Sequence, residues 1–224
     1  MNNVVKKLKK RRNSSIVKTT IRTGTKIAHG NIVSAIINTV AGMSITLRET
    51  RAIELLNRVC GGDEQAKECL LLILRSSTHD LNEVITSVIL KTIDESNIIK
   101  RYLLAKIMSY YIENNGFDYF HEMLFNNINL FNDVDFKNIL EIAYQIKTNQ
   151  ITNDTHGEWL IFRTTTENRH LIITLLKLIS LQILLRGPDG LGDTLKDREI
   201  QWVRISPYNN ALNVLAEYLT QLKI

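Results

Sequence analysis

The sequence predicts a mainly α-helical protein, a multi-helix bundle with a small C-terminal winged-helix-like α+β unit. Three observations lead to this fold class. Only two prolines, Pro188 and Pro207, interrupt 224 residues, so few positions forbid a helix. Leu and Ile recur at helical spacing along most of the chain. Near the C-terminus, a Gly-rich turn and a strand-like run separate two apolar helical stretches, which is the order of a winged-helix tail.

The N-terminal segment carries the positive charge of the chain. The formal net charge is +5, yet residues 1–48 hold ten basic and no acidic residues, whereas residues 49–224 hold 18 basic and 23 acidic residues. We therefore predict a basic mobile arm over residues 1–26, disordered in about its first 20 residues. Such a cluster is attracted to anionic lipid and to nucleic acid alike. Its candidate contact residues are Lys6, Lys7, Lys9, Lys10, Arg11 and Arg12.

An uncharged stretch, "NIVSAIINTVAGMSITL" over residues 31–47, follows this arm. Helical spacing places its apolar residues on one face, and the opposite face is small and neutral, unlike an ordinary solvent face. Three interpretations stay open: a core helix, a membrane-seeking helix, and a seam between copies of the chain. The candidate membrane or assembly face consists of Ile32, Val33, Ile36, Ile37, Val40 and Met43.

Polar residues within this stretch limit the membrane interpretation. Residues 27–47 are long enough to span a bilayer, but two asparagines and His29 would be costly in lipid. A spanning helix would leave the basic arm on the cytoplasmic side. A secretory signal fits poorly because the apolar part begins too far from the start of the chain. Small residues such as Gly30 and Ala41 would allow close approach of two helices.

Capping patterns then mark successive helices. Thr46 with Glu49 indicates a helix start, and Gly61–Gly62 indicates the end of that helix. We expect Asp63 to cap the next helix.

The same patterns continue through the middle of the chain. Asp80 with Glu83 opens a helix, and a longer one is expected over about residues 95–113, ending at "NNG". An aromatic-rich short helix and a loop follow. Asn132 with Asp135 then caps a helix that runs to about residue 146.

The polar, Thr-rich residues 148–166 interrupt the helical pattern and enclose the apolar island "WLIF". We interpret them as a linker with room for a short strand. The predicted organisation is thus a basic arm (1–26), a helical domain with an amphipathic N-terminal helix (27–147), the linker, and a winged-helix-like unit (167–224).

Within this C-terminal unit, a strongly apolar helix opening near Thr164 leads into the turn "RGPDGLGD" and a predicted strand over 198–206. Ser206, followed by Pro207, is expected to cap the last helix. In a winged-helix protein the helix before the wing can read a DNA groove. Here that helix carries Lys177, Gln182 and Arg186 among many apolar residues, which is a sparse set for base reading.

The chain contains no recognisable catalytic motif. Asp154, His156 and Glu158 lie within five residues and could hold a metal, but a loop histidine between carboxylates is more often a solvated turn. The Gly-rich turn follows a helix, whereas a dinucleotide loop follows a strand. We interpret Cys60 and Cys69 as buried thiols in a reducing compartment. The sequence therefore predicts a protein that is not an enzyme and has no cofactor or metal site.

Three segments together resemble the bacterial abortive-infection alpha-type proteins. They are "IRTGTKIAHGNIVSAIINTVAGMS", "DESNIIKRYLLAKIMSYYIENNGFDYFHEMLFNNINLFNDVDFKNIL", and the tail "LKLISLQILLRGPDG" with "VRISPYNNALNVLAEYL". The resemblance is one of pattern and order over most of the chain. It implies a role in phage defence and a winged-helix-like ending, and it transfers no functional residue.

We therefore expect a non-enzymatic bacterial effector or regulator of the phage-defence type, whose N-terminal amphipathic segment mediates membrane association or self-assembly. The expected partners are an anionic membrane surface or further copies of the chain, without a small-molecule substrate. The expected location is the cytoplasm or the inner face of the inner membrane. The alternative is a winged-helix regulator that uses the basic arm on DNA.

Overall fold

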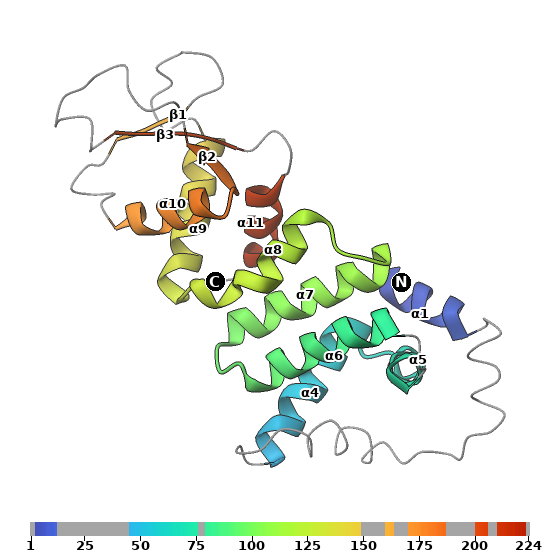
Figure 1. The fold of residues 1–224 in the computed structure, drawn as a ribbon. Helices are drawn as coiled ribbons and strands as arrows, with labels where there is room; N and C mark the ends of the chain where they lie inside the picture. Colours follow the sequence, from blue (N-terminus) through green and yellow to red (C-terminus); the bar gives the residue numbers. More distant parts are fainter. Residues whose placement is uncertain are drawn as a thin grey trace. The chain divides into compact units, whose positions relative to one another are not determined.

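The structure, a computed structural model, describes residues 3–12, 45–75, 79–148, 160–163, 170–186, 200–205 and 210–222. Its contacts divide the chain into unit 1, Met1–Asp118, and unit 2, Tyr119–Ile224 (Figure 1). These ranges contain nine α-helices, one short 3₁₀-helix and a small sheet. The prediction of a mainly α-helical protein is confirmed.

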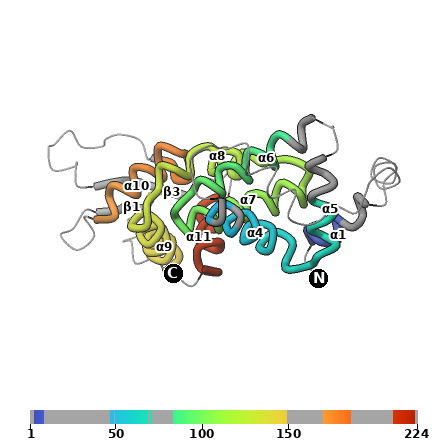
Figure 2. The backbone as a smooth tube through the Cα atoms, turned by 90° about the horizontal axis from the view of Figure 1, so that it is seen from below, coloured from blue at the N-terminus to red at the C-terminus, as the bar shows by residue number. Residues whose placement is uncertain are grey.

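Unit 1 is helical throughout its described residues. Its helices are α1 (Asn3–Arg12), α4 (Ile45–Cys60), α5 (Glu64–Arg75), α6 (His79–Asp94) and α7 (Ile98–Asn114). The central helix is α7, which packs against α1, α4 and α6 and lies side by side with α6 in both views of the backbone (Figures 1 and 2). Because α7 has neighbours on several sides, its buried residues surround the helix and do not form one stripe.

Helix ends in unit 1 follow the local sequence. Gly61 and Gly62, with φ of 60° and 77°, end α4, and the Oδ1 of Asp63 accepts a 3.0 Å hydrogen bond from the amide of Ala66 at the start of α5. Asn115 ends α7 in the left-handed conformation, with φ of 60°. The predicted ends at Gly61–Gly62 and at "NNG", and the cap at Asp63, are confirmed.

The first helix corrects one expectation. Residues 3–12 form α1, where the sequence analysis predicted a disordered, mobile arm. Val4, Val5 and Leu8 are buried, because positions 4, 5 and 8 share one side of a helix and supply an apolar contact with unit 1. Three apolar residues are enough to dock a short basic helix. The disorder predicted for these residues was wrong.

Unit 2 combines helices with a small sheet. The helices are α8 (Tyr119–Asn127), the 3₁₀-helix η1 (Ile128–Leu130), α9 (Asp133–Lys147), α10 (Leu171–Ser180) and α11 (Ala211–Gln221). The strands are β1 (Leu160–Arg163), β2 (Leu184–Arg186) and β3 (Ile200–Ile205), in the order β1-β3-β2. Both pairs are antiparallel, with Leu160 opposite Val203 and Leu184 opposite Ile205.

Two predicted features of unit 2 have clear outcomes. The apolar island "WLIF" contributes β1, as the linker prediction allowed. The last helix begins at Ala211 after Asn210, so the predicted start at Ser206 and Pro207 was wrong. Ser206 and Pro207 match the pattern of a helix start, but Asn210 still precedes the helix and is its N-cap residue.

Candidate functional site

The six basic residues predicted as a contact site lie on α1. Lys6 is exposed, whereas Lys7 donates a hydrogen bond through Nζ to the backbone carbonyl of Glu113, near the C-terminal end of α7. Carbonyl groups at a helix C-terminus carry partial negative charge and bind a lysine favourably. Adjacent lysines therefore differ in role: Lys7 holds α1 against α7, and Lys6 faces solvent.

The residues of the predicted membrane or assembly face lie outside the described residues. They are Ile32, Val33, Ile36, Ile37, Val40 and Met43. The candidate metal trio Asp154, His156 and Glu158 also lies outside them. Leu47, the last residue of the uncharged stretch, and Ile53 both belong to α4 and are 45% and 48% exposed.

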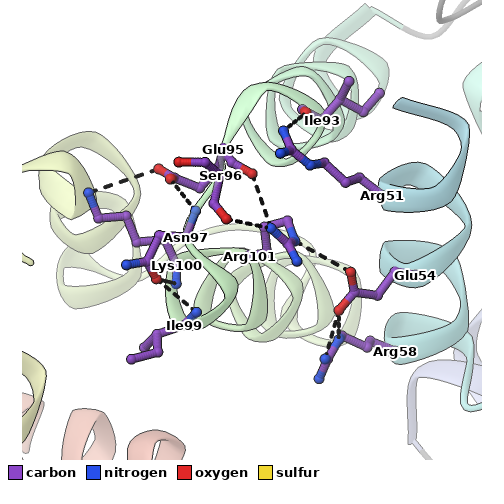
Figure 3. A network of polar contacts seen from close by, with 10 residues as sticks. All are labelled: Arg51, Glu54, Arg58, Ile93, Glu95, Ser96, Asn97, Ile99, Lys100 and Arg101. Carbon is purple, nitrogen blue, oxygen red and sulfur yellow. Dashed lines mark hydrogen bonds and ion pairs between the residues drawn. The ribbon is translucent and has the colours of Figure 1, made fainter. Parts of the chain in front are cut away.

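The turn between α6 and α7 is the polar centre of unit 1 (Figure 3). Nη1 of Arg51, from α4, donates a 2.8 Å hydrogen bond to the carbonyl of Ile93. Nη1 of Arg101, from α7, donates to the carbonyls of Ser96 at 2.8 Å and Glu95 at 3.3 Å. Both guanidinium groups thus bind carbonyls where α6 ends, which offsets the negative end of the α6 dipole.

Glu54 of α4 connects two cations of this network. Its Oε1 accepts from Arg58 at 2.8 and 3.1 Å, and its Oε2 lies 3.4 Å from Nε of Arg101 (Figure 3). Beside this pair, Arg58 and Lys106 lie 5.4 and 5.3 Å from the centre of the Tyr102 ring, within cation–π range. These contacts join α4 to α7 and use the cations internally, so the arrangement is a structural clamp.

The start of α7 is closed by its own side chains. The Oδ1 of Asn97 accepts from the amides of Ile99 at 2.8 Å and Lys100 at 3.1 Å. Oε1 of Glu95 accepts from the amide of Asn97 at 2.8 Å, and its Oε2 lies 3.9 Å from Nζ of Lys100. Amide donors of this helix N-terminus are therefore occupied within the chain.

Among the residues of unit 2 that the structure describes, the most buried acid lies at the interface between α9 and α10. Asp135 is 3% exposed and accepts hydrogen bonds from Thr174 at 2.7 Å, Lys177 at 2.6 Å and the amide of Asn132 at 2.8 Å. Burial alone would raise the pKa of Asp135, but these bonds from Lys177, Thr174 and Asn132 lower it below its ordinary value. Asn132 and Asp135 form the predicted capping box.

The contacts of α10 within the chain determine which of its side chains remain exposed for a partner. Lys177, which the sequence offered for base reading, binds Asp135. Gln182 has a left-handed φ of 56°, and its Oε1 accepts from the hydroxyl of Tyr119 at 3.2 Å. The outward face of α10 instead carries Ile173, 67% exposed, and Leu176, 45% exposed. That face is apolar and lacks the cations of a DNA-reading helix.

A buried histidine joins the first and last helices of unit 2. His121 of α8 is 2% exposed, and its Nε2 lies 3.0 Å from the hydroxyl of Tyr218 in α11. The ring of Phe120 packs edge-on against it. The pair satisfies two polar groups within an apolar contact, which is a structural arrangement.

The arginine network was not predicted from the sequence. Arg48 and Arg51 are 3% and 9% exposed, and Nη2 of Arg48 lies 3.7 Å from Asp94. Both lie on the side of α4 that also buries Leu55. A charged residue at a helical position shared with core residues is the signal that would have indicated a buried polar contact.

Two features are absent from the described ranges. No helix there is long and apolar enough to cross a bilayer, and no group of three or more His, Cys, Asp or Glu side chains is placed to hold a metal ion. In comparisons with known proteins, the chain matched no family model, no curated protein and no solved structure.

Proposed function

We propose that this protein is a non-enzymatic effector or regulator of the bacterial phage-defence type that acts by association. In this proposal the uncharged residues 31–47 mediate membrane association or self-assembly through the face that includes Ile36, Ile37 and Val40. The resemblance in order and pattern to abortive-infection alpha-type proteins supports the biological setting. The unit 1 architecture supports the mechanism.

One structural observation carries the proposal. Residues 31–44 of the uncharged stretch lie between α1 and α4 in the sequence, its last three residues begin α4, and both of these helices are anchored in unit 1. Helix α1 packs against the unit through the buried residues Val4 and Leu8, and α4 through the buried residues Leu55 and Val59. The apolar face of α1 is therefore already used within unit 1, so an apolar contact with lipid or with a second copy requires another stretch of the chain. The uncharged residues next to α4 supply a suitable pattern.

The test is a substitution on the proposed face with a matched control. Ile36→Asp should abolish dye release from anionic vesicles and any concentration-dependent oligomer, because a carboxylate on that face opposes burial in lipid or in a seam. Ile98→Asp makes the same change at a residue of α7 that is 56% exposed, and it should leave both activities unchanged.

Thermal unfolding of both variants distinguishes the open interpretations. If Ile36→Asp strongly destabilises the fold and wild-type protein neither releases dye nor associates, residues 31–47 are a core helix and the proposal is wrong.

A winged-helix regulator that binds DNA is the second candidate. The order β1-β3-β2, with α10 directly before β2, is the observation that favours it. The apolar outward face of α10 argues against base reading by this helix, and a fold of this kind also serves protein docking. Duplex binding with a steep salt dependence, weakened by removing basic charge from α1, would favour the DNA-binding candidate.

A further inference from the structure

Some residues of helix α1 pack against unit 1, and others are exposed to solvent. Val4 and Leu8 are fully buried and Val5 is 4% exposed, so the apolar side of α1 belongs to unit 1. Lys7 binds the carbonyl of Glu113. Lys6, directly beside it, is exposed. Helix α1 is therefore packed against unit 1 through its apolar residues, and Lys6 keeps its charge exposed to solvent.

Positive charge is concentrated in unit 1 and particularly in α1. By sequence, unit 1 holds 18 basic and 11 acidic residues, a net charge of +7, whereas unit 2 holds 10 basic and 12 acidic residues, a net charge of −2. Six of the basic residues fall within the ten residues of α1, which contains no acid. A helix of ten residues is about 15 Å long, so this is a high local density of charge.

We infer that α1 is an electrostatic anchor that holds unit 1 against the anionic surface of a membrane without entering it. Insertion of α1 into the lipid would require its apolar side, but Val4 and Leu8 on that side are already buried within unit 1. The helix contains no aromatic residue on which a base could stack, and four of its six cations are lysines, which act as point charges. These features favour a charged lipid surface over nucleic acid. The inference rests on the proposed membrane association and narrows it.

The measurement is co-sedimentation of the full chain with vesicles of phosphatidylcholine alone and of phosphatidylcholine mixed with phosphatidylserine, at low and high salt. Binding should require phosphatidylserine and should weaken steeply with salt, because exposed charges are screened. Removal of a solvent-facing charge such as that of Lys6 should weaken binding about fivefold, the change that corresponds to about 1 kcal/mol per basic residue.

Adjacent lysines provide a matched pair of variants. Lys6→Gln should weaken vesicle binding about fivefold and leave the melting temperature unchanged, because its side chain is exposed. Lys7→Gln should lower the melting temperature, because it removes the contact with Glu113. Charge reversal in the double variant Lys6→Glu/Lys10→Glu should abolish measurable binding. Lys137→Glu, an exposed reversal in α9 of unit 2, should bind as the wild type does.

Three results would overturn the inference: binding to neutral vesicles, full binding by Lys6→Glu/Lys10→Glu, or a preference for duplex DNA over anionic vesicles at the same salt. The proposed function fails separately. If Ile36→Asp and wild type are equally active in dye release, residues 31–47 lose their assigned role. The inference about α1 still holds in that case if wild type and Ile36→Asp both bind anionic vesicles in a way that depends on salt and on Lys6.

Discussion

Arg51 donates a 2.8 Å hydrogen bond to the backbone carbonyl of Ile93 and so joins α4 to the last turn of α6. The two residues are 42 positions apart, and Arg51 is 9% exposed. Arg101 of α7 donates hydrogen bonds to the next carbonyls along the chain, those of Glu95 and Ser96. Unit 1 is thus held at the end of α6 by cations from two neighbouring helices, in addition to its apolar core.

Replacement of Arg51 by alanine should lower the free energy of unfolding by about 2–3 kcal/mol, because a charged donor is lost and the carbonyl of Ile93 stays buried without it. The matched control is Arg58→Ala, which removes a partly exposed arginine of the same helix that pairs with Glu54. Its cost should stay below about 1 kcal/mol. Urea unfolding measures both, and equal losses in the two variants would contradict a clamping role for Arg51.

The α9–α10 interface predicts a specific pH dependence. The folded-state pKa of Asp135 is depressed, so its contribution to stability is present above the unfolded-state pKa of about 3.9. That contribution is lost as the pH falls through the lower folded-state value. The free energy of unfolding of the wild type should therefore decrease in this acidic range, because Asp135 becomes protonated.

Asp135→Asn should remove this part of the pH dependence and lower stability at neutral pH by about 1–3 kcal/mol, since the charged partner of Lys177 is lost. Asp133→Asn, in the same first turn but exposed, is the control and should keep the wild-type pH profile. Denaturant unfolding across the acidic range measures both variants. If the stability of Asp135→Asn falls with decreasing pH as steeply as that of the wild type, other carboxylates cause the acid sensitivity.

Local spacing predicted several helix ends correctly, because capping patterns act within a few residues, although it misplaced the start of the last helix at Ser206. The Asn132–Asp135 box and the Gly61–Gly62 stop depend on neighbouring residues alone. Docking of α1 was missed because its three apolar residues lie among lysines, and their burial depends on distant helices. The Arg51 contact with Ile93 likewise depends on how α4 and α6 pack, which local spacing does not determine.

Two glycines provide a test of backbone conformation. Gly62 has a φ of 77° and open space around an added Cβ, so any cost of Gly62→Ala comes from the backbone and not from a steric contact. We expect a loss of about 1 kcal/mol. Gly116 also has open space and is not among the positive-φ residues of the described ranges. Gly116→Ala should therefore be neutral or stabilise by about 0.4–1 kcal/mol. Thermal unfolding that ranks these variants in the reverse order would contradict the conformation of the α4–α5 turn.

The orientation of α10 can be tested with a pair of neighbouring substitutions. Ile173→Asp places a carboxylate on the outward face and should change stability by no more than about 0.5 kcal/mol. Leu175→Asp places the same group at a position that is fully buried, where an unpaired charge should cost several kcal/mol and unfold unit 2. Circular dichroism during denaturation separates the two cases. If Ile173→Asp is as damaging as Leu175→Asp, the apolar face of α10 is covered within the chain, and its exposure could not be used against base reading.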